Sequence, residues 1–397
     1  MKILSIETSC DDTGITIFEA KGGTTKASFK ILSNIVSSQD IHAEFGGVFP
    51  MMAKREHIKN LPIVLDISLK KAKLTKSKKP VDAIAVTYGP GLEPCLWSGI
   101  VFAKELAEKW DVPIIPVNHM EGHILSVFAK PKGTFNISLT KKQFPMLTLL
   151  VSGGHTELVL VKDLGKYEII GKTLDDAAGE AYDKVARMLG LPYPGGPALS
   201  RLAEEKRKEL GDLFEHENEN RKGFQSMSER RLASATARAR GIFQQKNIRA
   251  EQGHTLEIFP LPRPMLKSPN FHFSFAGLKT AVLYGLKKIE PLNDAKKKMV
   301  AMEFENAVID TLLYKTMKAS DKYGIKSVII AGGVAANKHL QKQFRQAFGK
   351  KNVLLPDNAL TGDNALMIGI AGYLRYMQGK KKVPKPASIK ANGNLEL

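Results

Sequence analysis

The sequence predicts an α/β protein built from two lobes of related design that face a cleft. A chain of 397 residues exceeds the usual size of a single hydrophobic core. Two kinds of structural unit also occur twice each. We expect a β-hairpin at 3–18 and again at 146–161, and a strand–glycine–helix unit at 83–110 and again at 327–348. This coarse duplication argues for two related lobes.

The first half of the chain supplies the first copy of each unit. Strands are expected at 3–6 and 15–18, on either side of the polar turn at 7–14. A strand of the buried type at 83–88 continues through a Gly-Pro-Gly turn into a helix over 97–110. Each unit therefore contains a turn of small or polar residues directly after a strand.

The second half repeats this order. Strands are expected at 146–151 and 158–161, joined by the turn Ser-Gly-Gly-His-Thr at 152–156. The apolar run at 327–331 then leads through two glycines into a helix over 337–348. No lysine signature of a P-loop follows either glycine turn, which excludes a P-loop enzyme.

The chain is strongly basic. Lysine and arginine number 59 against 40 acidic residues, which gives a net charge of +19. Such a field favours polyanions such as nucleic acid, or an acidic small molecule, although solubility is an alternative reason for it. The stretch 221–249 holds eight basic residues and a single acid, Glu229. We interpret 209–256 as a basic insertion in the second lobe and as the strongest nucleic-acid candidate, although basic runs are usually solvated faces.

Cysteine usage and the N-terminus indicate the cytoplasm. Cys10 and Cys95 are the only cysteines, so no disulfide framework is expected. The N-terminus turns acidic at Glu7, too early for the apolar stretch of a signal peptide. No run approaches the length of a membrane span.

The segment 118–123, Asn-His-Met-Glu-Gly-His, is the most distinctive in the chain. His119 and His123 are four residues apart, so on a helix they share one face and can hold one metal ion. A structural role is an equally good reading of the pair. A zinc protease helix has the same histidine spacing, but Glu121 is turned about 200° from His119 and cannot easily reach a metal-bound water.

A site with two histidines needs an oxygen ligand. Asp363, at a glycine-containing turn before a helix expected at 365–376, is the best candidate. Two imidazoles and one carboxylate suit iron(II) or zinc and not magnesium. Taken alone, Asp363 is better interpreted as a helix cap.

Three further segments could contact a ligand. The glycine turn at 152–156 could bind an anion, and the glycines at 332–333 could let a flat ligand or a phosphate approach. Asp176, Glu180 and Asp183 are expected on one helical face, where their repulsion would be relieved by a bound cation or by ribose hydroxyls. Structural turns and a solvated acidic face are the alternatives.

Taken together, these segments resemble the universal tRNA threonylcarbamoyladenosine transferase family in its bacterial form. The resemblance covers nearly the whole chain, and several ordered motifs of this length make a chance match negligible. The motifs are those at 3–11, 42–48, 119–123, 150–156, 175–184, 273–280 and 363–364.

The resemblance implies an architecture. It is the duplicated actin-like ATPase fold, of the ribonuclease H-like type, which sugar kinases and heat-shock chaperones share. The first lobe would comprise 1–142, with 364–397 packing back onto it, and the second lobe would comprise 143–363.

The resemblance also implies a site. His119, His123 and Asp363 would bind one divalent metal ion, with iron(II) favoured over zinc. Asp11 would assist catalysis, in the way of an acid that positions the attacking amine. The co-substrate threonylcarbamoyl-AMP would be bound through its phosphate by Leu150, Val151, Ser152, Gly153 and Gly154, and through its ribose and base by Asp183, Gly196 and Asn337.

The implied reaction moves the threonylcarbamoyl group to N6 of the adenosine beside the anticodon, position 37, in tRNAs that read ANN codons. The implied partners are tRNA, a paralogous subunit, a small ATPase and a separate synthase that makes the adenylate. A metallopeptidase, a non-catalytic nucleotide-binding scaffold of the same fold and an ATP-driven kinase or chaperone are the alternatives. The paralogous scaffold is expected to lack the histidine pair and Asp363.

The chain departs from the family pattern at a few places. Asn118 stands where histidine is more usual, and Ala335 stands where serine is common. The segment 93–97 is bulkier than the usual small apolar run, and the basic insertion has no counterpart among the members compared. None of these departures touches the implied metal ligands.

Overall fold

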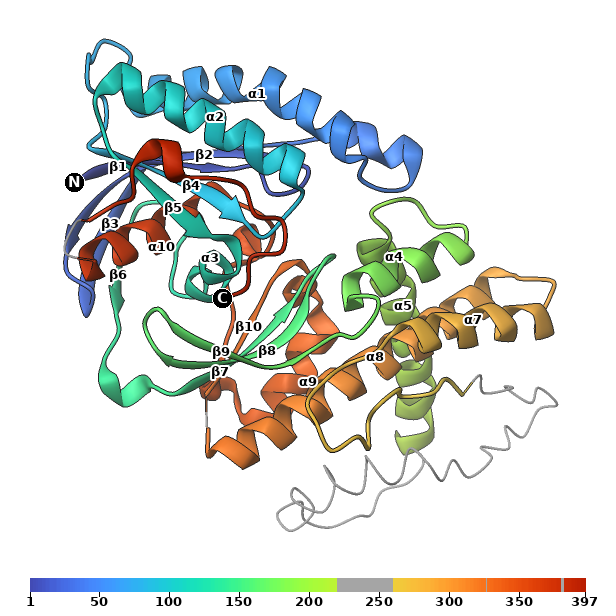
Figure 1. Ribbon diagram of the computed structural model, residues 1–397. Coiled ribbons are helices and arrows are strands. Elements are labelled where there is room, and N and C mark those ends of the chain that lie inside the picture. The colour runs from blue at the N-terminus through green and yellow to red at the C-terminus, as the bar shows by residue number, and fades with distance from the viewer. Residues whose placement is uncertain (220–259, 326, 380–381) are drawn as a thin grey trace.

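A computed structural model describes residues 1–219, 260–325, 327–379 and 382–397 (Figure 1). Most of the predicted basic insertion, including the stretch 221–249, therefore lies outside the described residues. Within the described ranges, no helix has the length and apolar character needed to cross a membrane.

The chain forms two mixed β-sheets, one in each half. The first sheet has the strand order β5-β4-β1-β2-β3-β6, and the second has the order β11-β10-β7-β8-β9. The strands of the first sheet are β1 (Lys2–Glu7), β2 (Asp12–Gly22), β3 (Lys26–Ser38), β4 (Ala83–Gly89), β5 (Ile114–Asn118) and β6 (Thr134–Ser138). Those of the second sheet are β7 (Met146–Val151), β8 (Thr156–Asp163), β9 (Lys166–Lys172), β10 (Val328–Ala331) and β11 (Val353–Leu354).

The two sheets repeat one topology. In each, an antiparallel meander of three strands, β1-β2-β3 or β7-β8-β9, is extended by two parallel strands, β4 and β5 or β10 and β11. Both predicted hairpins and both strand–glycine–helix units are present at these equivalent places. The predicted duplicated, two-lobed α/β fold is therefore confirmed. The third strand of each meander was not predicted.

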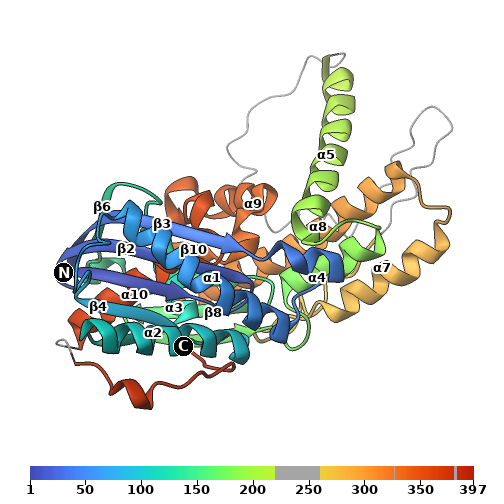
Figure 2. The ribbon, with the colours of Figure 1, turned by 90° about the horizontal axis from the view of Figure 1, so that it is seen from above.

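Helices cover both faces of the first sheet (Figures 1 and 2). Side chains of β1 and β2 alternate between them: Leu4 and Ile17 pack against α1 (Pro50–Lys71) and α2 (Glu93–Trp110), whereas Ile3 and Phe18 pack against α10 (Ala365–Gln378). The C-terminal segment then crosses the end of β4, where the amide of Asn392 donates to the carbonyl of Tyr88 at 2.9 Å.

Five described helices form the second lobe together with its sheet. They are α4 (Ala178–Met188), α5 (Gly195–Glu219), α7 (Ala276–Lys288), α8 (Asp294–Tyr323) and α9 (Lys338–Phe348). Their apolar faces share one core with the sheet, which includes Leu149, Phe304 and Val328. The chain also contains short 3₁₀ helices, η1 (Asp40–Phe45), η2 (Lys141–Gln143), η3 (Gly333–Ala336), η4 (Lys350–Asn352), η5 (Asn358–Leu360) and η6 (Pro386–Ser388).

The short helix α3 (His119–Ser126) lies between the lobes, and all eight of its residues are buried. Met120 and Ile124 pack against the second sheet beside Leu150 and Ile329, whereas Leu125 belongs to the core of the first lobe. The predicted histidine pair therefore lies where the two lobes meet.

Candidate metal centre

Helix α3 begins directly after β5, at the carboxyl end of the three parallel strands of the first sheet. Asn118 caps the helix, because its side-chain oxygen accepts hydrogen bonds from the amides of Met120 at 2.8 Å and Glu121 at 3.3 Å. Asparagine at this departure from the family pattern thus has a structural role. The cap sets the first turn of the helix, on which His119 lies.

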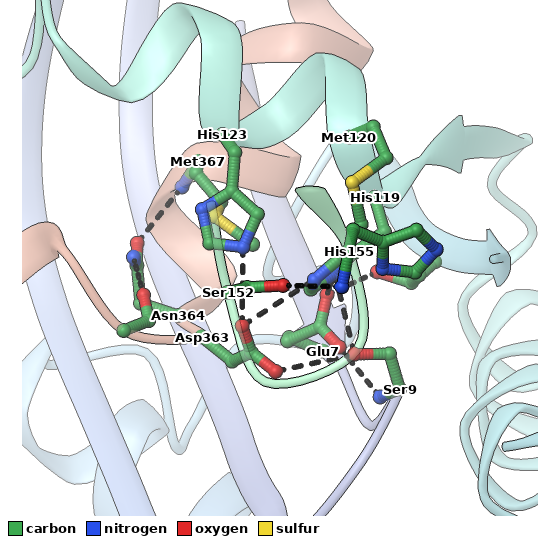
Figure 3. Close-up of polar contacts among 12 residues, drawn as sticks. Glu7, Ser9, His119, Met120, His123, Ser152, His155, Asp363, Asn364 and Met367 are labelled. Atoms are coloured by element: carbon green, nitrogen blue, oxygen red, sulfur yellow. Dashed lines mark hydrogen bonds and ion pairs between the residues drawn. The ribbon is translucent and has the colours of Figure 1, made fainter. Parts of the chain in front are cut away.

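The three predicted ligands meet (Figure 3). Oδ1 of Asp363 lies 3.3 Å from Nε2 of His119 and 3.2 Å from Nε2 of His123. One ligand atom from each residue lies within 4.8 Å of the other two, and no other group of three such residues gathers in the described part of the chain. Both histidines are buried, and Asp363 is partly buried. The expectation that two imidazoles and a distant carboxylate converge is confirmed.

Asp363 is not the cap of the helix that follows it. The residue before α10 is Asn364, whose side-chain oxygen accepts a hydrogen bond from the amide of Met367 at 3.0 Å. Asp363 instead points to the histidines and accepts from the hydroxyl of Ser9 at 3.4 Å. The alternative interpretation of Asp363 as a helix cap is therefore wrong, because the neighbouring asparagine already fills that position.

A fourth residue, Glu7, is hydrogen-bonded to His119. Nδ1 of His119 donates to Oε2 of Glu7 at 3.1 Å, and Glu7 also accepts from the amide of Ser9 and the hydroxyl of Thr87, both at 2.5 Å. Glu7 is fully buried at the end of β1. A carboxylate bonded to Nδ1 directs Nε2 toward a metal and makes the imidazole a better ligand. The sequence did not single out Glu7 as a site residue. The one available signal was that this acid directly follows a strand expected to be buried.

The charges of the centre are coupled. Burial opposes ionisation of Asp363, but the adjacent His119 and His123 outweigh it and hold the pKa of Asp363 well below its ordinary value. Burial also opposes protonation of His119, yet Asp363 and Glu7 raise the pKa of His119 to about 10. Burial lowers the pKa of His123. The carboxylates of Glu7, which is buried, and Asp363, which is partly buried, thus favour positive charge beside the two rings, and a metal cation would supply that charge.

The donor set fits a transition metal. Two imidazole nitrogens and one carboxylate oxygen, all facing one point, suit iron(II) or zinc better than magnesium, which prefers oxygen ligands and water. The three residues leave coordination positions for an exogenous ligand. The residues present therefore fit the ion that the sequence implied.

The glycine turn of the second lobe faces the same region. The amide of Ser152 donates to the carbonyl of His155 at 2.8 Å, and the amide of His155 donates to Oγ of Ser152 at 3.1 Å. Gly153 and Gly154 are exposed, and among the described residues no protein acceptor faces their amides. Two of the four turn amides, those of Gly153 and Gly154, therefore remain available to an anion.

His155 brings this turn to the histidine pair (Figure 3). Burial, together with the charges of His119 and His123, lowers the pKa of His155 to about 4. His155 is therefore neutral near pH 7 and lies within electrostatic reach of the centre. The sequence pattern places His155 in a turn that could bind an anion but does not indicate its proximity to the histidine pair, because only the meeting of the lobes creates it.

Comparison with known proteins identifies the family. The family model described as tRNA N6-adenosine threonylcarbamoyltransferase matches residues 30–228 and 224–370. The chain belongs to this family. A relative from Thermosipho africanus that bears this name is 40% identical over 400 residues and covers all of both chains. One of the same name from Bacillus thuringiensis is 38% identical over 406 residues, which cover 100% of this chain and 96% of the relative.

Solved structures of other proteins show more distant likenesses. HypF from T. kodakarensis is 16% identical with a TM-score of 0.45, over 96% of this chain and 48% of that one. The activator of the 2-hydroxyisocaproyl-CoA dehydratase from Clostridium difficile is 12% identical with a TM-score of 0.44, over 97% and 99% of the two chains. Likenesses at this level bear on neither activity nor ligands.

The other residues expected to bind the adenylate surround the glycine turn. Leu150 and Val151 are buried in β7, so their contribution to a phosphate site would come from the backbone. Gly332, with a φ of 95°, turns the chain after β10 against this strand, where a Cβ would lie 2.5 Å from the carbonyl oxygen of Val151. A Cβ on Gly179 would lie 2.6 Å from the carbonyl oxygen of Ser152. Glycine is thus required on both sides of the turn.

Two backbone amides hold the carboxylate of Asp183 in place. Its Oδ1 accepts from the amides of Gly195 at 2.8 Å and Gly196 at 3.3 Å, so it connects α4 to the start of α5. Burial, only partly offset by these bonds, raises the pKa of Asp183. The contact of Asp183 and Gly196 with ribose stays a prediction.

The prediction that Asp176, Glu180 and Asp183 repel one another is wrong. Asp176 precedes α4 and pairs with Lys184 at 2.7 Å and with Lys279 at 3.1 Å. Glu180 pairs with the same Lys184 at 2.7 Å. The lysines provide the compensating charge, so these two carboxylates need no ligand. Lys279 lies in a distant segment, and its proximity depends on the packing of α7 against α4.

Both polar groups of the Asn337 side chain, the oxygen and the amide, already make hydrogen bonds. Its oxygen caps α9 by accepting from the amide of Leu340 at 2.9 Å, and its amide donates to Glu305 at 2.5 Å and Ser200 at 3.0 Å. A bond from Asn337 to the ribose or base would have to replace one of these. The assigned role of Asn337 remains a prediction.

Asp11 lies in the turn between β1 and β2 and is partly buried. His57 of α1 holds this turn, because its Nε2 donates to the carbonyl of Cys10 and its Nδ1 is bonded to the hydroxyl of Thr13, both at 2.8 Å. Burial and the nearby charge of Asp11 raise the pKa of Tyr193, which follows α4 in the second lobe. Asp11 is therefore within electrostatic reach of Tyr193 in the opposite lobe.

Proposed function

We propose that this protein transfers the threonylcarbamoyl group from threonylcarbamoyl-AMP to N6 of adenosine 37 in tRNAs that read ANN codons and releases AMP. The observation that carries the proposal is the convergence of His119, His123 and Asp363 beside the open glycine turn of the second lobe. The names of the family and of its relatives supply the chemistry.

His119, His123 and Asp363 would hold one divalent metal, with iron(II) favoured over zinc, and Glu7 would orient His119. A metal bound there would polarise the carbonyl of the threonylcarbamoyl group as a Lewis acid. The burial of both histidines keeps water away from them and fixes their direction. The protein thus contributes two buried imidazoles of fixed direction and one partly buried carboxylate.

The amides of Gly153 and Gly154 would bind the phosphate of the adenylate. In the reaction, N6 of adenosine forms a bond to the carbamoyl carbon while the bond from that carbon to the phosphate oxygen breaks. AMP leaves with the electron pair, and the proton that the amine loses is released to solvent. Because an exocyclic amine is a weak nucleophile, we assign Asp11 to positioning it, and most of the rate enhancement to orientation and electrostatics.

We propose tRNA as the macromolecular partner, supported by the net charge of +19. A paralogous subunit, a small ATPase and a synthase that supplies the adenylate are proposed from the family alone. Cytoplasmic localisation is proposed from the cysteine usage.

The test is mass spectrometry of nucleosides from tRNA that lacks the modification, after incubation with threonylcarbamoyl-AMP. We expect threonylcarbamoyladenosine to form together with one AMP per modified adenosine. Asp363→Ala should abolish transfer, whereas Asp66→Ala, which removes an exposed partner of Lys70 on α1, should leave it unchanged. Full transfer by Asp363→Ala would reject the proposed centre.

The alternatives lead to other outcomes. A metallopeptidase would cleave peptides, and a chelator would inhibit the cleavage. Glu121 is the one acid within the histidine motif at 119–123, and it is bonded to Arg375 and Tyr167 and so is not free to act as a general base. A non-catalytic scaffold would produce no modified nucleoside. A kinase or chaperone would hydrolyse ATP with magnesium in place of the adenylate.

A further inference from the structure

The carboxylate of Glu121 lies between three segments that are far apart in the sequence. Nε of Arg375, on α10, donates to its two oxygens at 2.8 and 2.7 Å, and the hydroxyl of Tyr167, on β9, donates to Oε1 at 2.8 Å. Glu121 is 1% exposed, whereas the side chain of Arg375 is 43% exposed. The acid is therefore a buried charge whose partners come from both lobes.

The position of Glu121 on α3 is specific. It lies between the two metal-ligand candidates in sequence but on the opposite side of the helix, since two residues turn an α-helix by about 200°. Gly122 makes the close contact between α3 and α10: a Cβ there would lie 3.0 Å from Cδ1 of Ile368 and 3.1 Å from Cγ of Met367. The two helices thus meet at Gly122, with His119 and His123 on one side and Glu121 on another.

The same two helices carry the three ligand candidates. His119 and His123 lie on α3, and Asp363 directly precedes the first turn of α10. Arg375 lies 12 residues after Asp363, roughly 18 Å along the helix. Contacts at Asp363 and at Arg375 therefore connect α3 to two separate points, one just before the start of α10 and one near its end.

An ion pair with a buried member, such as Glu121, is often not needed for stability alone, because apolar residues can replace buried ion pairs without loss. Removing one partner, however, leaves a buried charge without compensation. Tyr167 adds a bond from the second lobe to the same oxygen, so the contact also depends on the two lobes being together. These features suit a role in alignment.

We propose that Glu121 is a positioning residue, which holds α3 on α10 through Arg375 and on the second lobe through Tyr167 so that His119 and His123 face Asp363. The inference rests on the proposed metal centre. It gives a role to the one acid of the histidine motif that the proposed reaction leaves unused.

The first test needs no metal. Hydrogen–deuterium exchange of the full chain, with chelator present, would be compared among wild type, Glu121→Gln, Arg375→Gln and Tyr167→Phe. We expect amides of α3 and of the turn at 361–367 to exchange about tenfold faster in the first two variants. Tyr167→Phe should speed exchange in α3 with a smaller effect on the turn.

Tyr373→Phe is the matched control. Tyr373 lies on the same helix α10, and its hydroxyl donates to the carbonyl of Gly22 at 2.7 Å within the first lobe. This variant loses a phenol hydrogen bond of the same kind, and we expect exchange in α3 to stay at the wild-type rate. The double variant Glu121→Gln/Arg375→Gln should be no worse than either single variant, because each single variant already lacks the contact and the double variant leaves no buried carboxylate unpaired.

The second readout is cobalt(II), used as a spectroscopic probe. We expect Glu121→Gln and Arg375→Gln to bind it roughly tenfold more weakly, with altered visible absorption bands, while Tyr373→Phe matches wild type. Wild-type exchange rates in α3 for Glu121→Gln and Arg375→Gln would overturn the proposal. If cobalt binds wild type and Asp363→Ala equally, the proposed centre has failed, and the exchange data still decide whether Glu121 positions α3.

Discussion

His119 and His123 are equivalent in the sequence pattern but not in the structure. Nδ1 of His119 is bonded to Glu7, whereas Nδ1 of His123 is buried without a hydrogen-bond partner among the described residues. A carboxylate behind a histidine fixes its tautomer and strengthens it as a ligand. We therefore expect His119 to be the better oriented and stronger metal ligand of the two histidines.

We predict that Glu7→Gln weakens metal binding by about 10- to 100-fold, because the variant keeps the shape of the side chain and loses its charge behind His119. Calorimetric titration of the metal-free protein with zinc measures the change. Glu19→Gln, on the neighbouring strand β2, is the control and should bind as wild type does. Equal affinity in Glu7→Gln and wild type would contradict the assignment.

Asp12 should make stability depend on pH. Burial, only partly offset by the hydroxyl of Ser38 at 2.5 Å, raises the pKa of Asp12 to about 6, and nearby acids add to the rise. The unfolded value is about 3.9, so the folded protein binds an extra proton between these limits. Stability from this group is therefore lost as pH rises through about 6.

The substitution Asp12→Asn removes the loss of stability that Asp12 causes at high pH. We expect the variant to be more stable than wild type by about 1 kcal/mol at pH 8, after allowance for solvent screening, with a smaller difference at pH 4.5. Urea denaturation at both pH values, in the presence of chelator, measures it. A stability difference that does not change with pH would show that Asp12 ionises normally.

At the scale of elements, small residues let α10 lie directly on the first sheet. A Cβ on Gly369 would lie 2.3 Å from Cε1 of Phe18, and one on Gly372 would lie 2.9 Å from Cβ of Ala85. This close packing fixes the start of α10, where Asp363 projects toward α3. The helix therefore helps to position a candidate ligand of the proposed metal centre, although it lies more than two hundred residues after the histidines.

Gly369→Ala should destabilise the protein by about 1–3 kcal/mol, because overpacking against Phe18 outweighs the better helix propensity of alanine. Gly277→Ala on α7 is the matched control. A Cβ there meets nothing within 4 Å, so the substitution should be neutral or stabilise by up to about 1 kcal/mol. Thermal unfolding of both variants distinguishes the two effects, and equal melting temperatures would count against the packing argument.

At the scale of the whole molecule, the proposed metal joins α3 to the turn that precedes α10, where the two lobes meet. A ligand that binds only the folded state stabilises it, by about 2.7 kcal/mol at a concentration one hundred times its Kd. We therefore predict that iron(II) or zinc raises the melting temperature of metal-depleted protein and that chelator reverses the rise. Asp363→Ala should show neither response, and a rise as large as that of wild type would place the metal elsewhere.

The charge of the chain yields a prediction at the same scale. Deleting 221–249 removes eight basic residues and one acid. We expect weaker binding of tRNA and a shallower dependence of affinity on salt, because fewer counterions are released. Filter binding across a salt series measures both, and an unchanged slope would exclude the insertion from the tRNA interface.

The sequence by itself determined the duplicated fold and the three ligand candidates. Alternation of apolar residues and short turn signals are local, so both hairpins and both strand–glycine–helix units could be predicted from them. The histidine pair is local as well, since its spacing is one helical turn. The family motifs connected this pair to Asp363, and the structure confirmed that the three residues meet.

Tertiary structure alone decided what surrounds those residues. Glu7 reaches His119 across 112 positions, and Arg375 reaches Glu121 across 254. Lys279 neutralises Asp176 from 103 positions away, which is why the expected acidic repulsion was wrong. Such contacts depend on how helices pack on sheets and on how two lobes meet. Periodicity and spacing describe one element at a time, so they hold no information about which distant side chain will lie beside it.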